Sequence, residues 1–379
     1  MNRSLRWLSF LALSVSLFVA SPAQAQQTKP GKLLVYVGTY TGPKSKGIYR
    51  YQLDLATGAM TPVGEPTESP NPSFLALAPN HKFLYAANEV GEFDGKKTGA
   101  VTAFSIDPAT GALTQLNQQS SEGSGPCHLV VDEAGKNVLV ANYGGGSIAA
   151  LPIQEDGRLS PASSAIPHKG KKASHAHSIN LDAKNRFAFA ADLGLDQVLV
   201  YKFDYNQGKL TANDPPAAEL AAGSGPRHFA FHPSGKTAYV INETSNSVTA
   251  FSYDADKGVL KEIQTITTLP ADFKSQSHTA EVQVHPSGKF LYGSNRGHDS
   301  LAIFAIEEDG KLKAVGHQPV GKAPRNFGVD PTGAYLLAAG QNSNSILVFK
   351  VDPQTGLLKQ VGEPVEIASP VCVKFMPLK

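Results

Sequence analysis

The sequence predicts an all-β protein, a seven-bladed β-propeller with four-stranded antiparallel blades. Short apolar runs of period two, bounded by Pro, Gly, Ser and Asn, predict strands. The unit that holds these strands, clearest from Ser224 to Phe251, recurs at intervals of roughly fifty residues, a spacing typical of propellers. The two ends of the chain each carry an incomplete unit. These observations favour a closed ring over a sandwich or a helical solenoid.

One unit is a meander of four strands. In the clearest copy the first expected strand starts at Pro226. The other three run from Thr237 to Ile241, from Ser247 to Tyr253 and from Val259 to Ile266. Turn-forming residues such as Pro233-Ser234-Gly235 separate them. These residue types supply the backbone angles that a tight reversal needs.

Seven copies of the first-strand pattern are present. They begin at Pro72, Pro126, Ala176, Pro226, Thr279, Pro324 and Pro370. The last copy stops after one strand, whereas the chain enters with a second-strand pattern from Leu33 to Tyr40. We therefore expect the C-terminal strand to join the first blade as its innermost strand. This closure would remove two open sheet edges.

The N-terminal residues predict export. Residues 1–25 read as a signal peptide, with Arg3 and Arg6 before an apolar run from Leu8 to Ala20 and a small-residue cleavage site ending at Ala25. The run is too short for a membrane anchor. Residues 26–379 are expected to form a single propeller domain, periplasmic or secreted, that works as a monomer.

Composition excludes several classes of partner and site. The formal net charge of +2 gives no reason to expect nucleic acid or an anionic membrane as a partner. The two cysteines, Cys127 and Cys372, begin innermost strands of blades that are not neighbours, so we expect free thiols. His175 and His177 lack a third ligand at metal-site spacing, and no glycine-rich loop opens a helix. Neither a metal nor a cofactor is expected.

Polar residues that differ between the repeats indicate the functional site. The start of each innermost strand and the end of the second strand share one mouth of the channel. The residues expected there include His177, Asp192, Arg227, His228, Glu243, Glu281, Arg296 and Arg325. Ionisable groups around a concavity are costly unless paired or used, so they are functional candidates. The alternative is that some form inter-blade salt bridges or caps, and Asp192 fits a turn cap.

Three of these residues, Arg227, Glu243 and Arg296, are expected to lie close together. The hairpin brings Glu243 beside Arg227, and Arg296 approaches from the next blade, with His177 on the preceding one. We expect these four to be catalytic. Substrate-binding residues are expected among their neighbours at the mouth, namely His128, His175, His228, Glu281, Arg325 and Asn326.

Four segments resemble a known family. They are SHAHS (174–178), AADLGLDQV (190–198), GSGPRHFAFHPSGKTAYVINE (223–243) and EVQVHPSGKFLYGSNRGHDSLAIF (281–304). They look like the lactonase family of seven-bladed propellers, which includes propeller-type 6-phosphogluconolactonase and the fungal carboxy-muconate lactonizing enzyme. The resemblance covers the chain after residue 25. It implies an active-site set of His177, Arg227, Glu243 and Arg296.

The expected function is therefore that of an exported, metal-independent lactonase that hydrolyses a sugar-type lactone. Glu243 would take a proton from water, His177 would be an alternate base or the leaving-group acid, and the two arginines would stabilise the oxyanion. Two alternatives stay open: a muconate-type cycloisomerase acting on a carboxylate, and a non-catalytic propeller that binds a ligand or a protein. Whether a lactone substrate carries a phosphate is also open.

Overall fold

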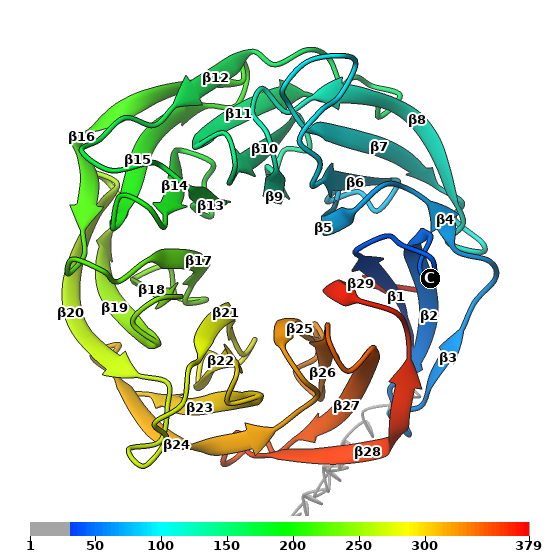
Figure 1. Cartoon of the computed structure of the whole chain (residues 1–379), viewed down its shortest axis with the longest axis vertical. Helices are drawn as coiled ribbons and strands as arrows, with labels where there is room; N and C mark the ends of the chain where they lie inside the picture. Colours follow the sequence, from blue (N-terminus) through cyan, green and yellow to red (C-terminus); the bar gives the residue numbers. More distant parts are fainter. Residues whose placement is uncertain (1–30, 379) are drawn as a thin grey trace, which may run out of the picture.

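The computed structural model describes residues 31–378, which form seven antiparallel sheets arranged in a ring (Figure 1). The prediction of a seven-bladed propeller is confirmed. The predicted signal peptide at residues 1–25 lies outside the described residues. Within the described part of the chain, no helix is long and apolar enough to cross a bilayer.

Each blade contributes one strand to the channel wall and a second strand paired with it. The innermost strands, from blade 1 to blade 7, are β29 (Pro370–Pro377), β5 (Pro72–Leu77), β9 (Pro126–Val131), β13 (Ala176–Leu181), β17 (Pro226–Phe231), β21 (His278–Val284) and β25 (Pro324–Val329). The second strands are β1 (Lys32–Thr39), β6 (Phe83–Asn88), β10 (Asn137–Asn142), β14 (Phe187–Asp192), β18 (Thr237–Asn242), β22 (Phe290–Arg296) and β26 (Tyr335–Gly340).

The third and fourth strands continue each blade outward. The third strands are β2 (Gly47–Asp54), β7 (Ala100–Ile106), β11 (Ser147–Pro152), β15 (Gln197–Asp204), β19 (Ser247–Asp254), β23 (Ser300–Ile306) and β27 (Ser345–Val351). The outer strands are β3 (Met60–Pro62) with β4 (Thr67–Glu68), β8 (Leu113–Ser120), β12 (Ser164–Pro167), β16 (Lys209–Glu219), β20 (Val259–Thr267), β24 (Leu312–Pro319) and β28 (Leu358–Glu366).

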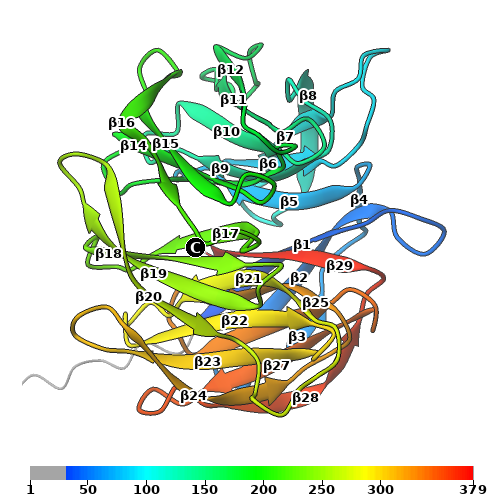
Figure 2. The same ribbon diagram turned by 60° about the vertical axis from the view of Figure 1, so that its left-hand side comes forward.

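The C-terminal strand closes the ring as predicted. β29 pairs antiparallel with β1, from Leu33 opposite Pro377 to Gly38 opposite Cys372. The two strands lie side by side in both views, red beside blue (Figures 1 and 2). The first and last strands of the propeller are therefore joined by main-chain hydrogen bonds, as the incomplete end repeats implied.

Blade 1 differs from the expected four strands because its outer strand is split into β3 and β4, both paired with β2. The gap between them contains Gly64, with φ of 63°, and Pro66. A left-handed residue turns the chain away from the sheet, and proline has no amide hydrogen to donate. The outer ladder of this blade is therefore interrupted.

The hydrophobic core lies between neighbouring blades. One buried cluster joins Phe189 of blade 4 to Phe229 and Phe251 of blade 5. A repeated hydrogen bond also ties blades together, in which a buried tyrosine of a second strand donates to a turn glycine carbonyl. The pairs are Tyr36 with Gly111, Tyr85 with Gly157, Tyr239 with Gly310 and Tyr292 with Gly356. These contacts hold the inner strands in a fixed ring around the channel.

Candidate active site

A β-bulge near the start of each innermost strand decides which side chains enter the channel. In blade 5, Pro226 pairs with Asn242 and His228 pairs with Ile241, so Arg227 is an extra residue with no partner. The pairing of innermost and second strands shifts at the same place in every blade. Neighbouring residues of a regular strand point to opposite faces, whereas a bulge re-aims one of them. Arg227 and His228 therefore both line the channel.

Two stacked rings of side chains result. The bulged residues form the first ring, and the residues that follow them form the second, deeper ring. The first ring contains Val371, Ser73, Cys127, His177, Arg227, Ala280 and Arg325. The second contains Cys372, Phe74, His128, Ser178, His228, Glu281 and Asn326. Both cysteines are buried and free, as expected.

Three of the four residues predicted to be catalytic converge on a carboxylate oxygen of the fourth, Glu243. Arg227 Nε lies 2.8 Å and Arg296 Nη2 lies 2.9 Å from Glu243 Oε2. His177 Nε2 lies 4.0 Å from the same oxygen. They come from three successive blades, through β13, β17, the residue after β18, and the end of β22. We use the name pit for the group that these four residues and Arg325 form at one mouth of the channel.

Burial and charge set the protonation of the pit. Burial alone would raise the pKa of Glu243, but Arg227 and Arg296 outweigh it, so the pKa lies below its usual value. Burial, followed by the charge of Arg227, holds the pKa of His177 well below its usual value. Burial and the neighbouring arginines lower the pKa of Arg227 to about 10. At neutral pH the pit therefore holds an ionised carboxylate, a neutral imidazole and charged guanidinium groups.

The opposite wall of the pit carries a second polar group, of which the sequence predicted only Arg325. Its guanidinium lies 5.4 Å from the centre of the Tyr40 ring. Tyr40 donates a hydrogen bond of 2.8 Å to Glu89. Within residues 31–378, no carboxylate comes within 4.0 Å of the Arg325 guanidinium. Tyr40 and Glu89 end or follow second strands, as Glu243 does, and this equivalent position was the signal that could have identified them.

Tyr143 is another pit residue that sequence reasoning did not single out. Its ring stacks on His175 at a centroid distance of 4.6 Å and meets His177 edge-on at 5.2 Å. The predicted substrate-binding residue His175 therefore lies at the rim, with Nδ1 3.1 Å from the Tyr143 carbonyl oxygen. Tyr143 follows β10, so it occupies in blade 3 the position that Glu243 occupies in blade 5.

Asp192 caps a turn and does not line the pit. Its carboxylate is fully buried, and Oδ1 accepts hydrogen bonds from the backbone amides of His175, Gly194 and Leu195. Oδ2 contacts His168 Nδ1 at 2.7 Å and the Ser174 hydroxyl at 2.5 Å. Asp192 is therefore a turn cap, which was the structural alternative to a functional role for this residue.

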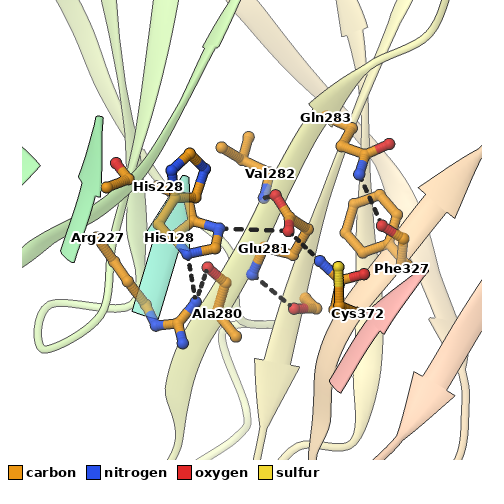
Figure 3. A network of polar contacts seen from close by, with 12 residues as sticks. His128, Arg227, His228, Ala280, Glu281, Val282, Gln283, Phe327 and Cys372 are labelled. Atoms are coloured by element: carbon orange, nitrogen blue, oxygen red, sulfur yellow. Dashed lines mark hydrogen bonds and ion pairs between the residues drawn. The ribbon is translucent and has the colours of Figure 1, made fainter. Parts of the chain in front are cut away.

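The remaining predicted substrate-binding residues lie in the second ring, below the pit. His128 accepts a hydrogen bond from the amide of Ile179. His228 lies between Arg227 and Glu281 (Figure 3). Asn326 donates a hydrogen bond to Glu281. Among residues 31–378, no cluster of three or more His, Cys, Asp or Glu side chains could hold a metal ion. A groove of about 830 Å³, lined by Lys44 and Glu363 among others, shares no lining residue with this charged site.

The fold and the site together define a seven-bladed propeller with a cationic polar pit at one mouth of its channel. The family model described as "Lactonase, 7-bladed beta-propeller" matches residues 34–375. The chain is 38% identical to the 6-phosphogluconolactonase of Bacillus subtilis, over 91% of this chain and 99% of that protein. It is 34% identical to the 6-phosphogluconolactonase of Pectobacterium carotovorum, with 91% and 99% coverage.

A solved structure is similar over the whole ring. The periplasmic gluconolactonase of Pseudomonas aeruginosa superposes with a TM-score of 0.86 at 33% identity, covering 92% of this chain and 100% of that one. The chain therefore belongs to the lactonase family of seven-bladed β-propellers. It is an enzyme of the lactone-hydrolase class.

Proposed function

We propose that this protein is an exported hydrolase that opens a sugar-type lactone at the pit without a metal ion. The observation that carries the proposal is the convergence of His177, Arg227 and Arg296 on Glu243. Ester hydrolysis needs a base for water and fixed donors for the oxyanion, and the pit contains both kinds of group.

The electrostatics favour His177 as the base. A base must be unprotonated at the working pH and must have a free lone pair. The lowered pKa of His177 keeps the imidazole neutral, whereas Glu243 Oε2 is already ion-paired with two guanidinium groups. Of the two candidate bases from the sequence, we therefore assign proton transfer to His177. Glu243 would orient both arginines.

The arginines would stabilise the tetrahedral intermediate. Arg227 uses Nε for Glu243 and Nη1 for the Ala280 carbonyl and His228, and its Nη2 bonds no described residue. Arg296 Nε is buried and also bonds nothing in the described chain. The free Nη2 of Arg227 is proposed to donate to the oxygen of the attacked carbonyl. Each well-placed donor of this kind contributes about 3 to 4 kcal/mol.

The ring would then open with proton return. Water adds to the lactone carbonyl as His177 takes its proton, the bond from that carbon to the ring oxygen breaks, and the imidazolium protonates the departing alkoxide. The product is a hydroxy acid. Arg325, which lacks a carboxylate partner in the described chain, is proposed to hold an anionic or hydroxyl group of the substrate.

A muconate-type cycloisomerase would use the same residues to move a proton to carbon. Relatives of this chain are named as 6-phosphogluconolactonases and a periplasmic gluconolactonase, which supports lactone hydrolysis. Lactone hydrolysis therefore has the better support. Export is proposed from the signal pattern at residues 1–25 and from the likeness to a periplasmic relative.

A substrate screen tests the proposal. Purified protein would be offered δ-gluconolactone, its 6-phosphate and a muconate, with turnover followed by pH-stat and ultraviolet absorbance. We expect a lactone to be hydrolysed, with the same rate after dialysis against EDTA. Periplasmic and cytoplasmic fractions of a native host would be blotted for the protein. Turnover of the muconate alone, or of none of the three, would contradict the proposed function.

A further inference from the structure

The second ring contains a polar chain directly beneath Arg227. Arg227 Nη1 lies 3.2 Å from His228 Nε2, and His228 Nδ1 lies 3.2 Å from Glu281 Oε2 (Figure 3). The side chains of His228 and Glu281 are 5% and 7% exposed. Both histidine nitrogens therefore face protein groups, and neither is available to a substrate in the pit.

The contact with Arg227 decides the tautomer of His228. A guanidinium has donors only, so Nε2 must accept and cannot carry a hydrogen. The ring hydrogen is then on Nδ1, which lies 3.2 Å from Glu281 Oε2 but without the angle of a hydrogen bond. Protonation of Nε2 would set two donors and two positive charges against each other. Burial and the charge of Arg227 lower the pKa of His228 well below its usual value, in agreement with a neutral ring.

Glu281 is itself held in place. Its carboxylate accepts from the amide of Val282 at 3.0 Å and from the side chain of Asn326 on blade 7. Its own amide donates to Ser294. A buried carboxylate costs several kcal/mol unless its lone pairs are satisfied. Burial raises the pKa of the Glu281 carboxyl above its usual value, and these hydrogen bonds hold the side chain beside the His228 ring.

This chain fixes the guanidinium of Arg227 in its plane. Nε is bonded to Glu243, and Nη1 is bonded to the Ala280 carbonyl at 2.7 Å and to His228. Because hydrogen bonds fix Nε and Nη1, the plane of the guanidinium and the position of Nη2 are fixed as well. A donor that is already oriented costs no reorganisation when the oxyanion forms.

We propose that His228 and Glu281 are positioning residues, which hold Arg227 so that its free nitrogen faces the reacting carbonyl. This role differs from substrate contact, the role that the sequence suggested for both residues. The expected effect on kcat rests on the proposed lactone hydrolysis. The tautomer of His228 and the rigidity of Arg227 do not depend on it.

The activity-independent test is NMR of protein labelled with ¹⁵N in histidine and arginine. His228, assigned by its absence in His228→Leu, should show the Nδ1-protonated neutral tautomer. The guanidinium of Arg227, assigned with Arg227→Lys, should give separate Nη signals because rotation is blocked. Those signals should merge or broaden in His228→Leu. An Nε2-protonated or cationic His228, or unchanged Arg227 signals in the variant, would overturn the inference.

The kinetic test uses variants that differ in whether an acceptor or donor survives. His228→Leu and Glu281→Leu should lower kcat about tenfold to a hundredfold with KM nearly unchanged, because a misdirected donor is felt mainly in the transition state. Glu281→Gln keeps an oxygen opposite Nδ1 and should recover part of kcat. His285→Gln removes another buried imidazole, one that bonds Ser287 and Gly333 on a blade edge, and should leave kcat unchanged.

The two kinds of failure can be told apart. If the wild-type protein hydrolyses no lactone, the proposed function fails, and the NMR result still decides whether His228 and Glu281 fix Arg227. If lactone is hydrolysed but both leucine variants keep the wild-type kcat at an unchanged melting temperature, the positioning role is wrong. The positioning role is also wrong if the leucine variants lose kcat only in proportion to a lowered melting temperature and Glu281→Gln recovers no kcat.

Discussion

Single residues in the pit differ in how their charges are satisfied. Glu243 is ion-paired with two arginines, whereas Arg325 has no carboxylate within ion-pair distance in the described chain. Arg227, Arg296 and Arg325 face the carboxylates of Glu243 and Glu89, so positive charge is in excess by one. Such a site attracts anionic groups and leaves a guanidinium free to bind one.

The pH profile is the first prediction at this scale. His177 works as a base only when neutral, and burial followed by Arg227 lowers its pKa. Activity should therefore be retained as the pH falls through the ordinary histidine value of about 6.5, and it should be lost only at lower pH. kcat/KM measured by pH-stat, corrected for spontaneous hydrolysis, would check this. A midpoint at or above the ordinary value would contradict the assignment of His177.

Arg325 carries the second residue-scale prediction. Arg325→Gln should raise KM for an anionic lactone by about tenfold or more, because a hydrogen bond to a charged group contributes about 1.5 to 3 kcal/mol. The effect on neutral δ-gluconolactone should be smaller. Lys322→Gln removes an exposed charge from the same blade and serves as the matched control. Equal effects on the charged and neutral lactones would contradict a role for Arg325 in anion binding.

Local elements place these residues through two devices, the bulge and the capped turn. The bulge lets adjacent residues such as Arg227 and His228 face the same channel. The Asp192 carboxylate fixes the backbone that leads into β13 through the amide of His175. Burial would raise the pKa of Asp192, but hydrogen bonds from His168, Ser174 and His175 outweigh it, and the pKa is lowered. The turn that precedes His177 therefore depends on an ionised, buried aspartate.

Asp192→Ala should destabilise the protein by about 3 kcal/mol or more, because it removes a buried charge from five hydrogen-bonding partners. The lowered pKa means that Asp192 contributes stability above its unfolded-state pKa. The difference from the wild type should shrink as the pH falls through the folded-state value. Urea unfolding at several pH values would measure this.

An exposed turn aspartate provides the control for that experiment. Asp204 accepts hydrogen bonds from the amides of Asn206 and Gln207 in a similar turn. Asp204→Ala should cost about 1 kcal/mol or less, because water can replace the lost acceptor. If Asp192→Ala cost no more than Asp204→Ala, the buried carboxylate would not have the structural role assigned to it.

The whole molecule depends on closing the ring. β29 supplies the innermost strand of blade 1, and Cys372 and Met376 of that strand belong to the core shared with blade 2. Each blade buries its apolar faces only against its neighbours, so an open ring would expose two faces and two strand edges. Closure therefore also stabilises the pit, because the blades that contribute its residues are part of the same closed ring.

Deleting residues 370–379 should give a protein that is insoluble or melts at a much lower temperature, since blade 1 loses its inner strand. A chain shortened by Lys379 alone is the control. Adding a synthetic peptide of residues 369–379 should raise the melting temperature of any soluble truncated protein, because the vacant edge of β1 can accept it. A truncated chain with the wild-type melting temperature would contradict the closure argument.

The blade count, the closure of the ring and the group of four polar residues at the mouth could all be predicted from the sequence. Period-two apolar runs and turn residues are local signals, and their repetition counts the blades without knowledge of long-range pairing. The mouth position of His177, Arg227, Glu243 and Arg296 followed from the same repeat.

The contacts and protonation of those residues depend on segments that meet only in the folded ring. The bulges depend on cross-strand register, which placed Arg227 above His228 and sent Glu281 and Asn326 below the pit. Burial and neighbouring charges set the protonation of His177 and Glu243, and neither can be read from the repeat pattern. The capping role of Asp192 likewise depends on its contact with the His175 amide. Local periodicity is carried by neighbours in the chain, whereas electrostatics and register arise between segments that meet only after the ring has closed.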